Sequence, residues 1–199
     1  MDERTLGVYD REAEAIAARH RAGAHELLHE AALTHFLRGQ PTADIGTGSG
    51  RDLAWLVANE FPAVRYEPSA GMRRELTATY PSLEVQDSSL PELTAIPDAS
   101  YANVLCAAVL MHLPAQSLPE ALRNLARITR PGGRLALTWR TSQSATDREA
   151  DGRLFSPIDT DKVASILTEC AVQLLHRETE QHPRQTGALW TLILGAKQS

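Results

Sequence analysis

The stretch that decides the fold is TADIGTGSGRDLAWL, which runs from Thr42 to Leu56. It begins with a short apolar run, continues through three glycines at every second position, and ends in a segment with helical spacing of apolar residues. A short buried strand that turns through glycines into a helix is typical of the ligand-binding corner of an α/β sheet. The ligand of such a corner is a phosphate nucleotide, a dinucleotide or a nucleoside without phosphate.

Strand and helix patterns alternate from this corner to the end of the chain. We expect strands at 42–46, 63–67, 82–87, 101–110, 134–139, 172–178 and 189–197, and helices at 50–61, 69–80, 118–129 and 159–170. This alternation predicts an α/β fold with a doubly wound, mostly parallel sheet. Ligands of such sheets bind beyond the carboxyl ends of the strands, where the glycine turn after the first strand lies.

The residues before the corner have helical patterns. Asp10 is the expected N-cap of a helix at 11–22, and a second helix at 24–38 ends before Gly39 and Pro41. We therefore interpret residues 1–199 as a single domain, with a helical cap at 1–40 and an α/β core at 41–199.

Composition narrows the classes of partner. The 199 residues carry a formal net charge of −5 and contain no run of basic residues, so we expect no nucleic-acid partner. The start of the chain has no secretory pattern, and no stretch approaches the roughly 20 apolar residues that span a bilayer, so we expect no membrane partner. Two widely separated cysteines, Cys106 and Cys170, favour a cytoplasmic protein with reduced thiols.

The residues around the glycines discriminate between the three ligands. A P-loop requires a Lys after its last glycine, but Arg51 and Asp52 follow Gly50. In the dinucleotide fingerprint the third glycine falls on Arg51, whose bulk opposes close packing of helix and strand. Asp44 precedes Gly46 by two residues, and an anion there repels a pyrophosphate but suits a cationic ligand.

Five segments together resemble class I S-adenosylmethionine-dependent methyltransferases. In chain order they are DIGTGSG (44–50), VRYEPSAGMRREL (64–76), VQDSSLPEL (85–93), IPDASYANVLCAAVLMHL (96–113) and LARITRPGGRLALTW (125–139). The resemblance spans about residues 42–140. It implies a Rossmann-like sheet of seven strands with the last strand antiparallel, the cofactor S-adenosyl-L-methionine and a methyl transfer reaction.

The resemblance also implies the residues that bind the cofactor. Glu67 ends the second strand and is placed to accept two hydrogen bonds from the ribose diol. Backbone N–H groups of the glycine turn are placed to meet the carboxylate of the methionine tail, and Asp44 its ammonium. Asp87 lies on the adenine side, and Met72 caps the adenine or belongs to the core. The complete expected set is Asp44, Gly46, Thr47, Gly48, Ser49, Gly50, Glu67, Pro68, Met72, Asp87, Ser88 and Ala107.

Three further residues are candidates for the chemical step. His112 follows the fourth strand and is either a base or a buried structural histidine. Tyr9 precedes the first long helix and either closes the site or packs there. Arg140 ends the fifth strand and either binds a carboxylate of the acceptor or forms a surface ion pair.

Residues 107–110 lack the motif that DNA base amino-methyltransferases carry after the fourth strand, so we expect a small-molecule acceptor with an O, N or S nucleophile. Two alternatives stay open: a non-catalytic S-adenosylmethionine-binding regulatory subunit, and an NAD-dependent dehydrogenase. We expect a monomer or a homodimer.

HELLH, residues 25–29, matches the zinc motif His-Glu-x-x-His. The extended motif requires glycine at position 32, where the sequence has Ala32, and a zinc site leaves the rest of the chain unexplained. We interpret His25 and His29 as polar residues of a helix and expect no metal.

Overall fold

The computed structural model describes residues 1–23, 25–81, 84–141, 147–181 and 188–198. In this part of the chain one sheet has the strand order β3-β2-β1-β4-β5-β7-β6. The strands are β1 (Thr42–Ile45), β2 (Ala63–Tyr66), β3 (Val85–Gln86), β4 (Tyr101–Ala107), β5 (Thr129–Thr141), β6 (Val172–Gln181) and β7 (Leu189–Lys197). The helices are α1 (Glu3–Arg11), α2 (Ala13–Arg21), α3 (Glu26–His35), α4 (Arg51–Ala58), α5 (Ala70–Thr79), α6 (Leu118–Ile128) and α7 (Thr160–Glu169), with the 3₁₀ turns η1 (Leu110–His112) and η2 (Ala115–Ser117).

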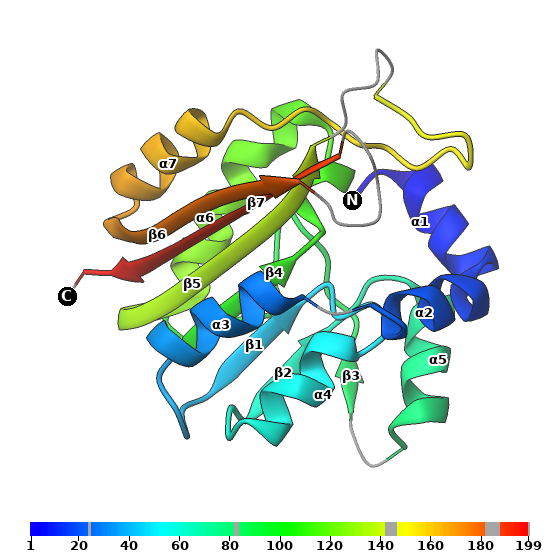
Figure 1. Ribbon diagram of the computed structural model, residues 1–199, viewed down its shortest axis with the longest axis horizontal. Helices are drawn as coiled ribbons and strands as arrows, with labels where there is room; N and C mark the ends of the chain where they lie inside the picture. Colours follow the sequence, from blue (N-terminus) through cyan, green and yellow to red (C-terminus); the bar gives the residue numbers. More distant parts are fainter. Residues whose placement is uncertain (24, 82–83, 142–146, 182–187, 199) are drawn as a thin grey trace.

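The sheet confirms the predicted topology. Strands β1 to β5 pair in parallel, and β7 runs antiparallel to both of its neighbours, β5 and β6. The strand order changes direction at β1 and β4, so the turns that follow these two strands open the crevice where ligands of this architecture bind. Helices cover both faces of the sheet (Figure 1).

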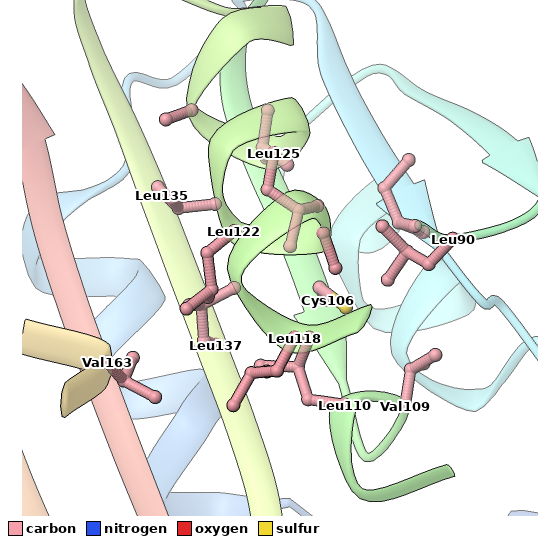
Figure 2. Packing of buried hydrophobic residues seen from close by; sticks show 14 of the residues in the cluster. Leu90, Cys106, Val109, Leu110, Leu118, Leu122, Leu125, Leu135, Leu137 and Val163 are labelled. Atoms are coloured by element: carbon pink, nitrogen blue, oxygen red, sulfur yellow. The ribbon is translucent and has the colours of Figure 1, made fainter. Parts of the chain in front are cut away.

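Alternation along β4 explains how the two helical layers are held. Val104 and Cys106 pack in the cluster that contains α6 and α7, whereas Leu105 packs on the other face with residues of α3 and α4. In Figure 2, Leu122 and Leu125 of α6 point toward the strands beneath them. A strand that is buried on both faces reads as a nearly continuous apolar run, as β4 does.

Helices α1 and α2 pack against α5, whereas α3 packs on the sheet. Val8 and Ile16 form a buried cluster with Met72 of α5. Figure 1 shows α1, α2 and α5 together at the end of the sheet toward which β1 points.

The expectation that Asp10 caps a helix at 11–22 is wrong. Asp2 caps α1, and Asp10 lies within α1. The Asp10 carboxylate instead accepts hydrogen bonds from the Ser69 hydroxyl at 2.7 Å and the Gly71 N–H at 2.9 Å, at the start of α5. The unpaired N–H groups of the α5 first turn therefore attract Asp10 across the fold.

Strand β4 ends earlier than the sequence indicates. It stops at Ala107, because Ala108 adopts a φ of 59° and the chain then enters η1. This early turn carries His112 back over the carboxyl edge of the sheet. Among the described residues, no helix combines the length and apolar character that crossing a membrane requires.

Candidate functional site

The glycine turn joins β1 to α4 at the carboxyl edge of the sheet. Gly46 has a φ of 76°, and a Cβ atom there would lie 2.4 Å from Cγ2 of Val109. The N–H of Gly46 donates to the carbonyl of Tyr66 at the end of β2, at 2.8 Å. The turn is thus held between the ends of β2 and β4, and a side chain at position 46 is excluded by both conformation and space.

Asp44 lies beneath this turn. Its residue is 2% exposed, and within the described part of the chain its Oδ2 atom has no hydrogen-bond partner. Burial raises the pKa of Asp44 to about 7, and the nearby charge of Asp52 adds to this effect. A buried carboxylate oxygen without a donor is costly, and it suits a ligand that brings a positively charged donor.

Glu67 lies directly after β2 and faces the same turn. One carboxylate oxygen accepts from the N–H of Gly48 at 2.8 Å, and the other from the N–H of Ser69 at 2.9 Å. Burial raises the pKa of Glu67 to about 7, although both N–H groups lower it. Each oxygen retains a lone pair for a further donor.

The remaining residues of the predicted cofactor set have different environments. Thr47 and Ser49 are buried in the turn, and Pro68, Ser88 and Ala107 are half-buried near the strand ends. Met72 is fully buried in the cluster with Val8 and Ile16, which favours its interpretation as a core residue. The Asp87 side chain is 67% exposed and pairs with Arg73 at 3.0 Å. Asp87 is therefore the outermost of the predicted ligands.

The half-buried Tyr9 and the buried His112 form a pair of side chains near the glycine turn. Nε2 of His112 is 3.0 Å from the hydroxyl oxygen of Tyr9, and Nδ1 is 2.7 Å from the carbonyl oxygen of Leu154. A carbonyl only accepts, so Nδ1 carries a proton and Nε2 accepts the O–H of Tyr9. Burial, together with the nearby charges of Arg153 and Arg140, lowers the pKa of His112 to about 4. His112 is accordingly neutral at physiological pH.

Residues 147–158 and helix α1 together enclose this pair. The N–H of Leu154 donates to the Thr5 hydroxyl at 2.8 Å, and Arg148 pairs with Asp2 at 2.8 Å. Ser156 joins the same segment to η1 through the Met111 carbonyl, at 2.8 Å. The enclosure therefore depends on contacts that residues 147–158 make with the N-terminal segment and with η1.

Arg140 reaches this enclosure from the end of β5. Its guanidinium lies 4.2 Å from the ring centroid of Phe155, whose ring is 4.9 Å from that of His112. The fold thus brings the three predicted candidates Tyr9, His112 and Arg140 to one place.

The sequence analysis missed two residues of this group, Arg153 and Phe155. Both belong to an irregular segment without periodicity, so no pattern in the sequence marks them.

The histidines of HELLH bind a carboxylate. His25 Nδ1 and His29 Nε2 lie 3.1 and 3.0 Å from the two oxygens of Asp52 in α4. Arg51 also pairs with Asp52, at 2.8 Å. Burial alone would raise the pKa of Asp52, but these partners bring it well below its usual value. In the described residues, no group of three or more His, Cys, Asp or Glu side chains is arranged to hold a metal.

Comparisons with known proteins agree with this architecture. The family model described as "Methyltransferase domain" matches residues 43–137. A protein from Haloferax volcanii, solved in complex with the Trm112 methyltransferase activator, has a TM-score of 0.74 and 14% identity, with 98% of each chain covered. No curated protein matches the chain.

Two further structures share the fold. An S-adenosylmethionine-dependent methyltransferase from Methanosarcina mazei has a TM-score of 0.72 and 16% identity, over 88% of this chain and 98% of that one. The 1,6-didemethyltoxoflavin-N1-methyltransferase of Burkholderia thailandensis, solved with 1,6-didemethyltoxoflavin and S-adenosylhomocysteine, has a TM-score of 0.66 and 17% identity, over 100% of this chain and 83% of that one. Residues 43–137 form a methyltransferase domain, and the chain has the fold of S-adenosylmethionine-dependent methyltransferases, which is consistent with a class I enzyme of this kind.

Proposed function

We propose that this enzyme transfers a methyl group from S-adenosylmethionine to an O, N or S nucleophile of a small molecule. The observation that carries the proposal is the hydrogen bond between the half-buried Tyr9 and the buried His112, a donor–acceptor pair near the glycine turn that supports proton transfer. Val109, just before η1, contacts Gly46, and Tyr9 packs against the cluster that contains Met72. The Tyr9–His112 pair therefore adjoins the glycine turn that we propose to bind the cofactor.

On the cofactor side, the chain's own groups define the binding mode that we propose. The Oδ2 atom of Asp44 accepts from the ammonium of the methionine tail, since the described structure gives that oxygen no other donor. N–H groups of the Gly46–Gly50 turn meet the carboxylate of the tail. Glu67 accepts from the ribose hydroxyls, and Asp87 and Ser88 meet the adenine edge.

On the acceptor side, Tyr9 and His112 move the proton. S-adenosylmethionine supplies an electrophilic methyl group on a sulfonium, whose sulfur keeps the electron pair when its bond to the methyl breaks. As the acceptor atom bonds to this methyl, its proton passes to the Tyr9 oxygen, and the Tyr9 proton passes to His112 Nε2. With a pKa of about 4, His112 is a weak base, so the proton leaves late, together with methyl transfer.

The enclosure supports a small acceptor. Tyr9 and His112 lie beneath contacts between α1 and residues 147–158, and His112 is 2% exposed. The net charge of −5 further disfavours a nucleic-acid acceptor. The enzyme of similar fold from Burkholderia thailandensis is named for a small molecule, which is in keeping with this proposal.

The test uses S-adenosylmethionine with a deuterated methyl group. The purified protein is incubated with a small-molecule extract, bulk tRNA, duplex DNA or protein, and mass spectrometry locates the label. We expect the label in the small-molecule fraction. Label that enters only a macromolecular fraction would overturn the small-molecule acceptor, and cofactor binding without transfer to any fraction would favour a regulatory subunit.

Once the labelling experiment has identified an acceptor, variants of the proton pathway test the chemical step with that acceptor. For a hydroxyl or thiol acceptor, His112→Asn should lower kcat by about a hundredfold or more, within the usual range of general base catalysis. Tyr9→Phe should lower kcat similarly, with S-adenosylmethionine affinity retained in both. The matched control is His176→Asn, on β6 and paired with Glu178, which should keep wild-type kcat.

We also propose that the chain acts as a monomer or a homodimer in the cytoplasm. Every group invoked above comes from one chain, and Cys106 and Cys170 are free thiols. The Haloferax volcanii protein is bound to an activator, so activity of the isolated chain, with its mass measured by light scattering, is the relevant test. An isolated chain that is inactive until an activator protein is added would contradict this part of the proposal.

A further inference from the structure

Two arginines lie buried together beside the Tyr9–His112 pair. The side chains of Arg140 and Arg153 are only 12% and 11% exposed. Their guanidinium carbons lie 4.2 and 5.5 Å from the ring centroid of Phe155. Two like charges with so little water around them require an anion between them.

The chain itself supplies a carboxylate at this position. One oxygen of Glu149 accepts from Nη2 of Arg140, and the other lies 4.0 Å from Nη2 of Arg153. The Glu149 side chain is 35% exposed, so it reaches in from the rim. Asp151 holds Nε of Arg153 separately, at 2.9 Å, and keeps that guanidinium in place.

This carboxylate position is adjacent to the proton pathway. Nη1 of Arg153 donates to the Tyr9 hydroxyl at 3.4 Å, and Tyr9 in turn donates to His112 Nε2 at 3.0 Å. The Phe155 ring contacts the arginines and also lies edge-on to His112. A molecule whose carboxylate lay between the arginines would thus extend along Phe155 and Tyr9 toward the proton acceptor.

We propose that the methyl acceptor is a small carboxylate, and that its carboxylate group replaces Glu149 between Arg140 and Arg153. Glu149 then acts as a built-in competitor that neutralises the arginines when no acceptor is bound. Arg153 is a specificity-determining residue, because it contacts both the carboxylate position and Tyr9. That the bound carboxylate is the methyl acceptor rests on the proposed function, whereas the anion site between the arginines does not depend on it.

The test is calorimetric titration of the protein, saturated with S-adenosylhomocysteine, with benzoate, benzamide and inorganic phosphate. Benzoate should bind at least about tenfold more tightly than benzamide, which has a similar shape without the charge, and more tightly than phosphate. Equal affinity for benzoate and benzamide would overturn the proposal. Tighter binding of phosphate would overturn the assignment to carboxylates.

Variants separate the roles of the charges. Arg153→Gln should weaken benzoate at least about tenfold, and Arg153→Lys should weaken it less. Glu149→Gln should tighten benzoate several-fold, because the competing charge is removed; unchanged or weaker binding would contradict the competitor role. Arg38→Gln and Glu60→Gln are the controls, since this exposed pair forms a similar ion pair elsewhere. If an Arg153 variant fails to fold, benzoate binding to Glu149→Gln still tests the proposal.

The outcomes distinguish this inference from the proposed function. Benzoate binding with the expected variant effects, but without methyl transfer to any small molecule, would leave the anion site standing and remove the proposed function. Transfer to small molecules that carry no carboxylate, with benzoate not bound, would keep the proposed function and remove this inference.

Discussion

The carboxylate of Glu67 joins the end of β2 to the glycine turn after β1, because it accepts the N–H of Gly48 at 2.8 Å. A hydrogen bond to a charged group contributes about 1.5–3 kcal/mol. If the free lone pairs of Glu67 hold the ribose, Glu67→Gln should weaken S-adenosylmethionine about tenfold to a hundredfold. Calorimetry measures this, with Glu60→Gln, an exposed glutamate, as the control. Unchanged affinity in Glu67→Gln would remove this residue from the cofactor site.

Cofactor affinity should depend on pH near neutrality. Burial raises the pKa of both Asp44 and Glu67 to about 7, so both carboxylates take up protons as the pH falls through that value. Their ionised forms are the ones that bind an ammonium or a ribose diol. The affinity for S-adenosylmethionine should therefore rise between about pH 6 and pH 8, with protons released on binding.

Calorimetry in two buffers of different ionisation enthalpy detects that proton release. Glu67→Gln should make the pH dependence shallower, since one of the two titrating groups is gone. An affinity that stays constant over this interval would show that neither carboxylate changes its charge on binding.

Asp44→Asn should stabilise the cofactor-free protein at high pH. The pKa of Asp44 is about 7 in the folded protein against 3.8 for an ordinary aspartate, so the folded state binds the proton more readily. This raised pKa makes the wild type lose stability as the pH rises from about 4 to about 7. At about pH 8 the variant should gain roughly 1–3 kcal/mol in the free energy of unfolding, because it buries no unpaired charge.

Urea unfolding at the two ends of this pH range measures the effect. At about pH 4 the wild-type carboxyl is neutral in the folded state and only partly ionised in the unfolded state, so the two proteins should differ little. The same variant should bind S-adenosylmethionine more weakly, since the partner of the ammonium has lost its charge. A variant that is less stable than the wild type at about pH 8 would contradict this account of Asp44.

The contact between α1 and α5 should depend on Asp10 and Gly71. A Cβ atom on Gly71 would lie 2.5 Å from the backbone oxygen of Asp10, so Gly71→Ala forces the helices apart. Asp10→Ala removes the acceptor of the Gly71 N–H and should cost about 1 kcal/mol of stability, as for loss of a helix cap. Limited proteolysis should then cut near α1 sooner than in the wild type. The control is Asp161→Ala, because the Asp161 side chain is 83% exposed. Equal proteolysis of the wild type, Asp10→Ala, Gly71→Ala and this control would contradict the prediction.

From the glycine turn onward the sequence predicted the strands, the helices and their order, because apolar periodicity and the glycine and proline breaks are local signals. Helix α1 (Glu3–Arg11) was not predicted. The helix expected at 69–80 begins with Ser69, whose hydroxyl caps α5 by accepting a hydrogen bond from the Met72 N–H. The β5 strand, expected at 134–139, instead begins at Thr129, where it pairs with Tyr101 across a register shift. Pairing with the neighbouring strand β4 determines that extension, and local patterns in the sequence do not predict it.

In the candidate site, too, some residues can be predicted from local sequence patterns and others only from the fold. The residues that we propose to bind the cofactor cluster around a local motif, so their spacing in the sequence points to them. Tyr9 and His112 are 103 positions apart in the chain, and their hydrogen bond follows from how α1 crosses the sheet edge. Asp10, Glu149 and Arg153 act through partners distant in sequence or in irregular segments, where no spacing rule applies. The structure is therefore needed for the acceptor side of the site and much less for the cofactor side.

A crystal structure with S-adenosylhomocysteine would show whether the glycine turn and its two buried carboxylates, Asp44 and Glu67, hold the cofactor. We predict the ribose hydroxyls within hydrogen-bond distance of Glu67, the ammonium on Asp44 and the carboxylate of the tail along Gly46–Gly50. Density for the ligand at any other place, with the glycine turn in contact only with protein, would contradict the account.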